Sequence, residues 1–306
     1  MEKRRLGRSD LHVSVMGLGC MSLGQDKEKA KSIIDEALEQ GVNYLDTADL
    51  YDFGTNEELV GEAIKGRRKN LILATKVGNK FEKGKEGWTW DPSKAHIKES
   101  VKKSLQRLQT DYIDLYQLHG GTIEDPIDET IEAFEELKKE GLIREYGISS
   151  IRPNVIREYV EKSSIVSVMM QYSILDRRPE ESIEDLLAEH NISIVARGPL
   201  AKGLLTSRGT DQLQRKFYNK DYLDYEYEDL ESTILHLANV RPTHSLEQTA
   251  LQYCLHNKAV ASVIAGASSV EQVLSNTTAA GSLPLKDSEV EDIKRLTKAN
   301  QYESHR

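Results

Sequence analysis

Four side chains that can hold or transfer protons stand just after three short apolar runs of the sequence; they are Asp46, Tyr51, Lys76 and His119. Apolar runs of this length are typical of buried strands, and the strands of a parallel barrel bring their carboxyl ends to one face. Taken singly, an aspartate at a strand end commonly caps a turn, and a lysine or a histidine commonly satisfies a local hydrogen bond. Four such residues on three consecutive strands predict one site instead.

Together these residues can deliver a proton to a carbonyl oxygen. An ammonium beside a phenol stabilises the phenolate that remains when the proton leaves, so Lys76 can assist Tyr51. Asp46 can hold the ammonium in place, and His119 can donate a hydrogen bond to the same carbonyl. A carbonyl that accepts a hydride needs donors of this kind for the developing alkoxide. The set contains no nucleophile with an adjacent base, and the eight histidines are scattered, so no metal site is expected.

The elements that must position these residues alternate between strand-like and helical patterns. Eight apolar runs predict strands, at Val15–Leu18, Val42–Leu45, Leu71–Ala74, Tyr112–Leu115, Ile143–Gly147, Ile165–Val168, Ile192–Val195 and Ala261–Ile264. Seven amphipathic stretches predict helices between them, at Lys27–Gln40, Glu57–Lys65, Ser93–Leu108, Ile127–Lys139, Pro153–Lys162, Pro179–His190 and Ser245–His256. Strands that alternate with helices form parallel sheets. Eight such units without a break in composition predict an α/β fold, a closed (β/α)8 TIM barrel that spans residues 1–306 as a single domain.

Two segments lie outside this alternation. Residues 2–14 place the turn Gly7–Asp10 between two short strand-like runs, which predicts an N-terminal β-hairpin that caps the bottom of the barrel. Residues 206–240 are too long for a simple loop and carry four tyrosines. Loops of this length are usually functional, so we expect a flap over the cofactor at the C-terminal face; a surface helix with one tyrosine stripe is the alternative.

Composition narrows the partners and the compartment. Thirty per cent of the 306 residues are charged, and the net charge of −9 argues against nucleic acid or an anionic membrane as the main partner. No apolar run is long enough to span a bilayer. The charged start, Met1–Arg5, leads into no apolar segment, so no secretory signal is expected. Two cysteines are too few for a disulfide framework, which favours the reducing cytoplasm; the oligomeric state is left open.

The sequence resembles the aldo-keto reductases along nearly its whole length. The matching stretches are MGLGCMSL (Met16–Leu23), GVNYLDTADLYDFG (Gly41–Gly54), NEELVGEA (Asn56–Ala63), LATKVG (Leu73–Gly78), SLQRLQTDYIDLYQLH (Ser104–His119), ELKKEGLIREYGIS (Glu136–Ser149), QYS (Gln171–Ser173) and PLAKGLL (Pro199–Leu205). The resemblance implies a barrel with long loops at its C-terminal face and a catalytic tetrad of Asp46, Tyr51, Lys76 and His119. It also implies reduction of a small-molecule aldehyde or ketone with NADPH, which is oxidised to NADP+.

By the same resemblance, the cofactor lies extended across the barrel mouth. The implied contacts are Cys20, Met21, Asp46, Ser149, Ser150, Gln171 and Arg197 beside the nicotinamide, then Gly198, Pro199, Leu200, Ala201, Lys202, Gly203 and Arg208 along the pyrophosphate, then Gly266, Ser268, Gln272 and Asn276 at the far end. Two positions depart from the family pattern: Ser150 stands where asparagine is common, and Gln272 stands where many relatives carry a phosphate-binding arginine. A helix start near Ser268 is a natural phosphate site, so we expect NADPH rather than NADH. Cys20 is either a thiol in the pocket or a small buried filler.

Three further residues carry alternatives. Arg197 stands where many relatives have an aromatic residue stacked on the nicotinamide, and its planar guanidinium either takes that stacking place or turns toward a phosphate or solvent. Trp88 and Trp90 lie in the long stretch after the third strand. We expect them to form an aromatic wall for the substrate together with Tyr51 and His119; packing on the surface is the alternative.

Two other functions stay open from the sequence. Some relatives of this fold act as cofactor-bound regulatory subunits of other proteins and turn over slowly, and an intact tetrad counts only weakly against that role. A metal-dependent hydrolase on the same barrel is opposed by the lack of a ligand cluster. Cofactor oxidation with a panel of aldehydes separates a reductase from a regulatory subunit, and metal analysis tests the hydrolase.

Overall fold

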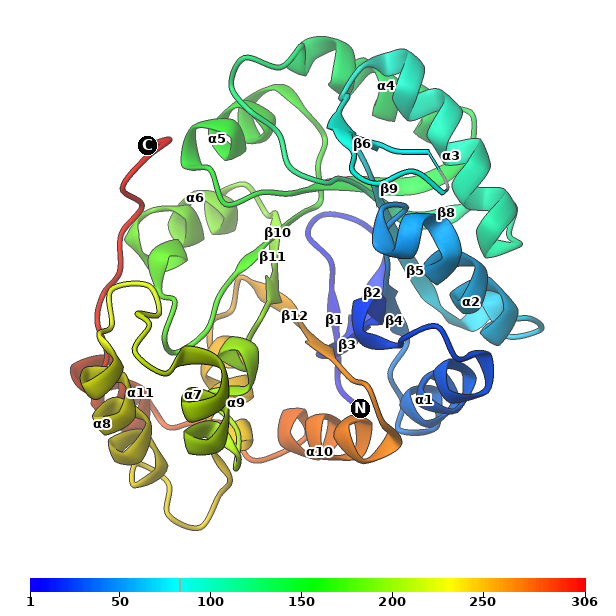
Figure 1. Ribbon diagram of the computed structural model, residues 1–306. Coiled ribbons are helices and arrows are strands. Elements are labelled where there is room, and N and C mark those ends of the chain that lie inside the picture. The colour runs from blue at the N-terminus through cyan, green and yellow to red at the C-terminus, as the bar shows by residue number, and fades with distance from the viewer. Residues whose placement is uncertain (83) are drawn as a thin grey trace.

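The computed structural model describes residues 1–82 and 84–306 and shows a closed barrel of eight parallel strands surrounded by helices (Figure 1). The eight predicted strands are confirmed, with ends that shift by a few residues: β3 (Met16–Gly19), β4 (Tyr44–Asp46), β5 (Ile72–Val77), β8 (Ile113–Leu118), β9 (Ile143–Ser149), β10 (Ser167–Gln171), β11 (Ser193–Arg197) and β12 (Val260–Gly266). Each strand pairs with the next in this order, and β12 pairs with β3. The predicted (β/α)8 TIM barrel is therefore confirmed.

Helices cover the outside of the barrel. They are α1 (Lys27–Glu39), α2 (Thr55–Ala63), α3 (Lys94–Leu108), α4 (Ile127–Lys139), α5 (Pro153–Lys162), α6 (Ile183–Glu189), α9 (Leu246–His256), α10 (Val270–Ala280) and α11 (Asp287–Leu296). The seven predicted helices are confirmed. One of them, α6, begins at Ile183 rather than at Pro179, because the residues Arg178–Glu181 form a separate 3-10 turn.

Helix α4 shows why these segments fold as they do. Its apolar residues recur every three or four positions, at Ile127, Ile131, Phe134 and Leu137, and all four are buried. Phe134 stacks on Tyr146 of β9, with ring centroids 5.2 Å apart. Burying one such side chain contributes about 1.5–3 kcal/mol. The buried stripe therefore fixes which face of the helix meets the barrel.

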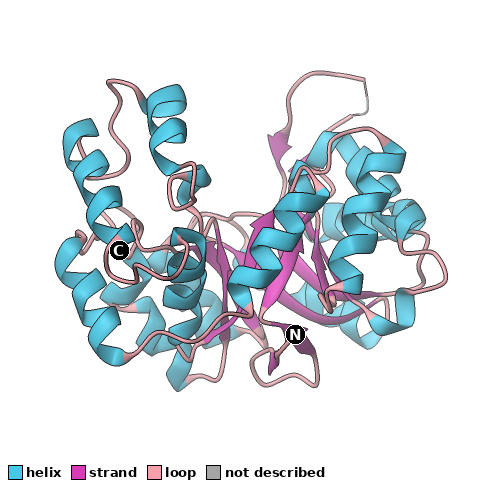
Figure 2. Ribbon diagram, turned by 90° about the horizontal axis from the view of Figure 1, so that it is seen from below, coloured by secondary structure: helices cyan, strands magenta, loops and turns pink. Residues whose placement is uncertain are grey.

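A two-stranded hairpin closes the amino-terminal end of the barrel, as the sequence predicts. β1 (Lys3–Arg5) pairs antiparallel with β2 (His12–Ser14). Its apolar side chains share one buried cluster with Tyr44 of β4; they are Leu6, Leu11 and Val13. Figure 2 shows the hairpin at one end of the barrel and the long loops at the other.

Two long connections project from the carboxyl ends of the strands (Figure 2). β6 (Asn79–Lys80) and β7 (Thr89–Trp90) form a short antiparallel hairpin between β5 and α3. The segment 206–240, called the flap below, contains the helices α7 (Gly209–Phe217) and α8 (Tyr227–Ala238). The flap therefore holds two helices rather than the single surface helix that was the alternative.

The strand register brings the predicted catalytic side chains to this same end. Asp46 ends β4 and pairs with Ala74 of β5, and Lys76 of β5 pairs with Gln117 of β8. Alternate residues of a strand face the same side, so Ala74 and Lys76 share a face. Asp46, Lys76 and Gln117 consequently lie along one wall of the barrel mouth.

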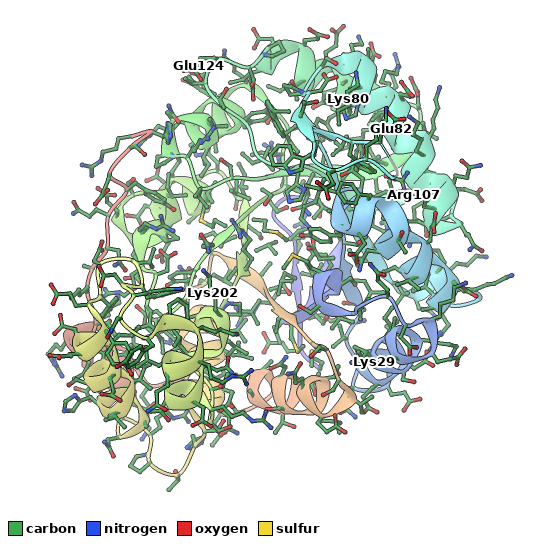
Figure 3. The ribbon with its side chains drawn as sticks, in the orientation of Figure 1. Lys29, Lys80, Glu82, Arg107, Glu124 and Lys202 are labelled. Atoms are coloured by element: carbon green, nitrogen blue, oxygen red, sulfur yellow. The ribbon has the colours of Figure 1, made fainter. Side chains whose placement is uncertain are left out.

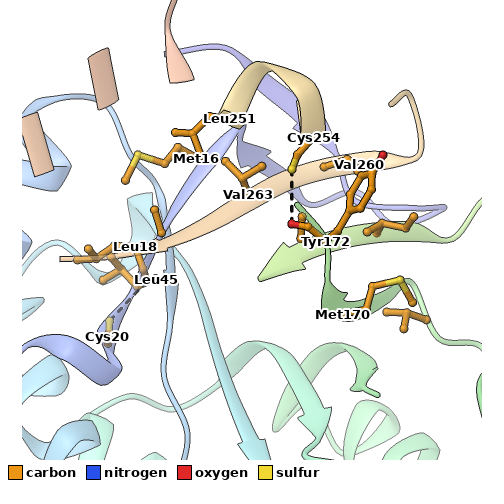
Figure 4. Close-up of a cluster of buried hydrophobic side chains, with 14 of the residues drawn as sticks. Met16, Leu18, Cys20, Leu45, Met170, Tyr172, Leu251, Cys254, Val260 and Val263 are labelled. Atoms are coloured by element: carbon orange, nitrogen blue, oxygen red, sulfur yellow. Dashed lines mark hydrogen bonds between the residues drawn. The ribbon is translucent and has the colours of Figure 1, made fainter. Parts of the chain in front are cut away.

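The main hydrophobic core fills the layer between the barrel and its helices. Figure 4 shows part of it, with Leu18 of β3 beside Leu45 of β4 and Met16 of β3 beside Leu251 of α9; Val263 of β12 belongs to the same cluster. In the part of the chain that the structure describes, no helix combines the length and the apolar character needed to cross a membrane.

Candidate active site

Lys76 is the centre of a buried hydrogen-bond network at the barrel mouth. Its Nζ donates to Oδ1 of Asp46 at 2.6 Å, to the main-chain oxygen of Thr47 at 2.7 Å, and to the hydroxyl of Tyr51 at 3.3 Å. Lys76 is 1% exposed and Asp46 is 3% exposed, so water does not screen the ion pair. Burial favours the neutral amine, but the Asp46 carboxylate and the Tyr51 hydroxyl outweigh it and raise the pKa of Lys76. An ammonium ion is therefore held against the tyrosine.

A tight turn carries Tyr51 into this network. The turn is the 3-10 helix Tyr51–Gly54, in which Asp52 and Phe53 have positive φ angles of 47° and 51°. Left-handed backbone costs a residue other than glycine about 1–2 kcal/mol, so the surrounding packing must hold the turn. Arg107 (Figure 3) packs against the end of the turn and pairs with the buried Glu57 at 2.7 Å. This buried ion pair supports the backbone that presents the tyrosine.

His119 follows β8 and meets the edge of the Tyr51 ring. The two ring centroids are 5.8 Å apart, with an interplanar angle of 82°. The Nδ1 atom of His119 is buried and has no hydrogen-bond partner among the described residues. Burial, together with the charges of Lys76 and Arg197, lowers the pKa of His119 to about 3. The imidazole is therefore neutral near neutral pH, with one N–H to donate.

Gln117 completes the network, although the sequence analysis gave it no role. Its side-chain nitrogen donates to Oδ2 of Asp46 at 3.2 Å, while Lys76 binds the other carboxylate oxygen. Gln117 is fully buried in β8. The available signal was its position two residues before His119, because alternate strand residues face the same side.

Comparison with known proteins now decides the family. The model of the aldo/keto reductase family matches residues 15–298. The chain belongs to this family. An uncharacterized oxidoreductase of Bacillus subtilis, YqkF, is 61% identical over 100% of both chains. The NADH-specific methylglyoxal reductase of Escherichia coli is 31% identical over 98% of this chain and 99% of that protein.

Solved structures of one aldo-keto reductase give the same result for the fold. The holo form of AKR11C1 from Bacillus halodurans matches with a TM-score of 0.94 and 62% identity, over 100% of this chain and 99% of that one. The apo form of the same protein matches with a TM-score of 0.86 over the same shares. The resemblance inferred from the sequence motifs is therefore confirmed at the level of family and fold.

In this aldo/keto reductase, Arg197 lies at the mouth with an unmet hydrogen-bond donor. Arg197 ends β11 and pairs in register with Gln171, which ends β10. Its Nε atom is buried and has no partner in the described parts of the chain. Burial lowers the pKa of Arg197. A buried donor without a partner costs free energy, so this atom fits a site that a cofactor completes.

Three of the predicted nicotinamide contacts gather on one side of the mouth. Ser149 and Gln171 end the neighbouring strands β9 and β10, and Ser149 is buried. The side-chain oxygen of Gln171 accepts a hydrogen bond from Arg178 at 3.4 Å, which leaves its amide nitrogen to donate. Ser150 lies beside them, but its hydroxyl already accepts from the main-chain N–H of Arg152 at 3.2 Å. Because a hydroxyl that accepts one hydrogen bond can still donate its own, all three side chains are available to a carboxamide, and that contact stays a prediction.

The predicted pyrophosphate stretch forms a tight turn after β11. Leu200 has φ −96° and ψ 11°, whereas Ala201 and Lys202 have positive φ angles of 48° and 58°. Within this turn the main-chain N–H of Ala201 already donates to the oxygen of Gly198 at 2.9 Å, so the contact of the turn with a pyrophosphate stays a prediction. The Nζ of Lys202 (Figure 3) lies 5.8 Å from the ring centroid of Phe217 in the flap. The other predicted contacts here are the exposed Gly198, the buried Pro199, the half-buried Gly203 and the exposed Arg208.

The predicted far end of the cofactor lies at the start of α10. Ser269 caps this helix by accepting from the main-chain N–H of Gln272 at 3.4 Å. The side chain of Gln272 folds back, and its oxygen accepts from the N–H and the hydroxyl of Ser268 at 2.7 and 3.1 Å. Asn276 is buried and donates to the main-chain oxygen of Gly266 at 3.3 Å. The two donors of Ser268 are the ones that an anion would use in place of Gln272.

The remaining predicted pocket residues have different surroundings. Cys20 is fully buried, and its Sγ donates to the main-chain oxygen of Leu18 in β3 at 3.7 Å (Figure 4). These surroundings fit a small side chain that packs in the core rather than a thiol in the pocket. Met21 is 65% exposed and Trp88 is 54% exposed. Trp90 is half-buried, and its indole packs over Gly78. The contribution of the two tryptophans to a substrate wall stays a prediction.

Proposed function

We propose that this aldo/keto reductase reduces aldehydes or ketones to alcohols with NADPH, and that Tyr51 donates the proton. The observation that carries the proposal is the contact of Lys76 with both Asp46 and Tyr51 at the barrel mouth. An ammonium at this distance stabilises the phenolate. Donors fixed in a dry site stabilise an oxygen that gains negative charge.

Each residue of the tetrad has one task in the proposed reaction. When bound, the cofactor supplies a hydride to the carbonyl carbon. The hydroxyl of Tyr51 gives its proton to the carbonyl oxygen, and Lys76 stabilises the phenolate that remains. The neutral imidazole of His119 donates its N–H to the same oxygen and so holds the carbonyl in place. Asp46 keeps the ammonium directed at the tyrosine.

For the cofactor we propose NADPH over NADH. The support is the start of α10, where the N–H and the hydroxyl of Ser268 can bind a phosphate and the helix dipole favours negative charge. The relative from Escherichia coli named as NADH-specific makes this preference a matter for direct measurement.

Oxidation of NADPH and NADH with a panel of aldehydes tests the proposed function. The panel includes methylglyoxal and 4-nitrobenzaldehyde, and a reaction without aldehyde gives the background. We expect a kcat of about 1 s⁻¹ or more with a reactive aldehyde, as is typical of enzymes. Tight cofactor binding with a kcat near background for every aldehyde would replace the proposal with a cofactor-bound regulatory subunit.

A further inference from the structure

The imidazole of His119 lacks the hydrogen bond that usually fixes a catalytic histidine. In such sites the ring nitrogen that faces away from the substrate commonly bonds to a carboxylate or a main-chain carbonyl. Here Nδ1 is buried and has no partner among residues 1–82 and 84–306. The orientation of the ring therefore depends on the main chain that carries it. On one side that chain is held by the His119 N–H, which donates to the main-chain oxygen of Val77 at 2.7 Å.

The indole of Trp90 packs against both main-chain segments that hold His119. A β-carbon placed on Gly120, the next residue, would lie 3.5 Å from Cη2 and Cζ3 of Trp90. A β-carbon on Gly78, which follows Val77, would lie 2.6 Å from the same Cζ3. At Gly78 only glycine permits so close an approach of the ring to the backbone, whereas the distance at Gly120 is that of an ordinary van der Waals contact. The same ring therefore packs against the residue that follows Val77 and against the residue that follows His119, which are the two partners of this hydrogen bond.

Asp125 holds the indole in this place. Both of its carboxylate oxygens accept from Nε1 of Trp90, at 3.0 Å each. The same carboxylate accepts from the N–H of Thr122 at 2.7 Å and from the Thr122 hydroxyl at 3.0 Å. Hydrogen bonds to an ionised group are about twice as strong as neutral ones. The carboxylate therefore ties the β6–β7 hairpin to the loop that follows His119.

We propose that Trp90, clamped by Asp125, is a positioning residue that fixes the His119 imidazole for its hydrogen bond to the carbonyl oxygen. The inference rests on the proposed function of the site. It assigns the indole a role in kcat, whereas the aromatic wall expected from the sequence is a role in substrate affinity. A displacement of about 1 Å at a catalytic group can cost about a hundred-fold in rate. Loosening the clamp should therefore slow the reaction without weakening binding.

Four variants separate these roles. Trp90→Phe removes the indole N–H and the ring atoms that reach Gly78, and Asp125→Ala removes the acceptor. Asp125→Asn keeps an acceptor oxygen and serves as the conservative rescue. Thr89→Ala, an exposed neighbour on the same hairpin, is the matched control.

Steady-state kinetics with methylglyoxal and titration of NADPH through its own emission give the readouts. We expect Trp90→Phe and Asp125→Ala to lower kcat about ten-fold, with KM and the NADPH dissociation constant changed by less than about two-fold. Asp125→Asn, which keeps one of the two acceptor oxygens but loses the charge, should have a kcat between those of Asp125→Ala and the wild type. Thr89→Ala should stay within about two-fold of the wild type in all three quantities.

A double-mutant cycle shows whether Trp90 acts through the imidazole. We expect Trp90→Phe to lower kcat about ten-fold in the wild type but less than about two-fold when His119 is already alanine. An equal loss in both backgrounds would overturn the proposal. So would a KM that rises more for 4-nitrobenzaldehyde than for methylglyoxal, because that is the effect of a substrate wall.

Two other results have distinct meanings. If Trp90→Phe lowers kcat, NADPH affinity and the melting temperature together, the residue has a merely structural role and the proposal is wrong. If His119→Ala by itself leaves kcat unchanged, the proposed function of the tetrad fails instead. The failure of the positioning role and the failure of the tetrad therefore give different data.

Discussion

The charge of Arg197 should make the protein distinguish reduced from oxidised cofactor. Its Nε is buried and unpaired at the end of β11, one strand away from Gln171, where the nicotinamide is expected. The oxidised nicotinamide ring is cationic and repels a guanidinium, whereas the reduced ring is neutral and electron-rich and attracts one. The wild-type protein should therefore bind NADPH more tightly than NADP+, which eases release of the oxidised product.

The size of the effect follows from the contact. A cation over an aromatic face contributes about 0.5–2 kcal/mol, which corresponds to about two-fold to thirty-fold in affinity. Arg197→Tyr keeps a flat group in place but removes the charge. It should therefore move the ratio of the NADP+ and NADPH dissociation constants toward NADP+ by an amount within that range.

Titration of both cofactor forms against both proteins measures this ratio. Arg197→Met is the matched control, because it removes the charge and keeps a long side chain; it should move the ratio in the same direction while weakening both forms. Equal changes in the two dissociation constants, or no change in either, would mean that Arg197 does not sense the ring and faces a phosphate or solvent instead.

Two further predictions concern the cofactor and the histidine. Fluorescence titration should give a dissociation constant for NADPH at least about ten-fold below that for NADH. Ser268→Ala should reduce this difference in affinity. Equal affinities of the wild type for the two cofactors would show that the lack of an arginine at position 272 decides the preference. Burial lowers the pKa of His119 to about 3, below its ordinary value. As the pH falls below about 6.5, the histidine therefore takes up a proton in the unfolded chain but not in the folded protein. The free energy of unfolding of the wild type should consequently fall in this range, by up to about 1.4 kcal/mol per pH unit. Urea unfolding of the wild type and His119→Gln between about pH 4 and pH 7 checks this slope, and parallel curves for the two proteins would contradict it.

The barrel, and the gathering of Asp46, Tyr51, Lys76 and His119 at its mouth, could be predicted because their signals are local. Parallel strands are buried on both faces and appear as continuous apolar runs. A polar side chain directly after such a run marks the carboxyl end of a strand, as Asp46 and His119 do. Family motifs then joined these positions across the chain.

Other parts of the site depend on contacts between residues that are far apart in the sequence, which the spacing of residue types does not predict. The role of Gln117 rests on the register of β5 against β8, which one sequence does not specify. Trp90 and Asp125 are 35 residues apart and meet only through the folded loops. The flap carries two helices whose first turns have no side-chain cap, so the usual start signal is absent from that segment.

The central claim is that Tyr51 is the proton donor, and Tyr51→Phe tests it most directly. The measurement is the rate of NADPH oxidation with a reactive aldehyde in a single turnover, together with the NADPH dissociation constant. Loss of general acid catalysis should lower the rate by about a hundred- to ten-thousand-fold and leave NADPH affinity within about three-fold. Phenylalanine has no hydroxyl to donate and leaves Lys76 no phenolate to stabilise. A Tyr51→Phe variant that keeps more than about a tenth of the wild-type rate would therefore contradict the account, because the proton would have to come from another group.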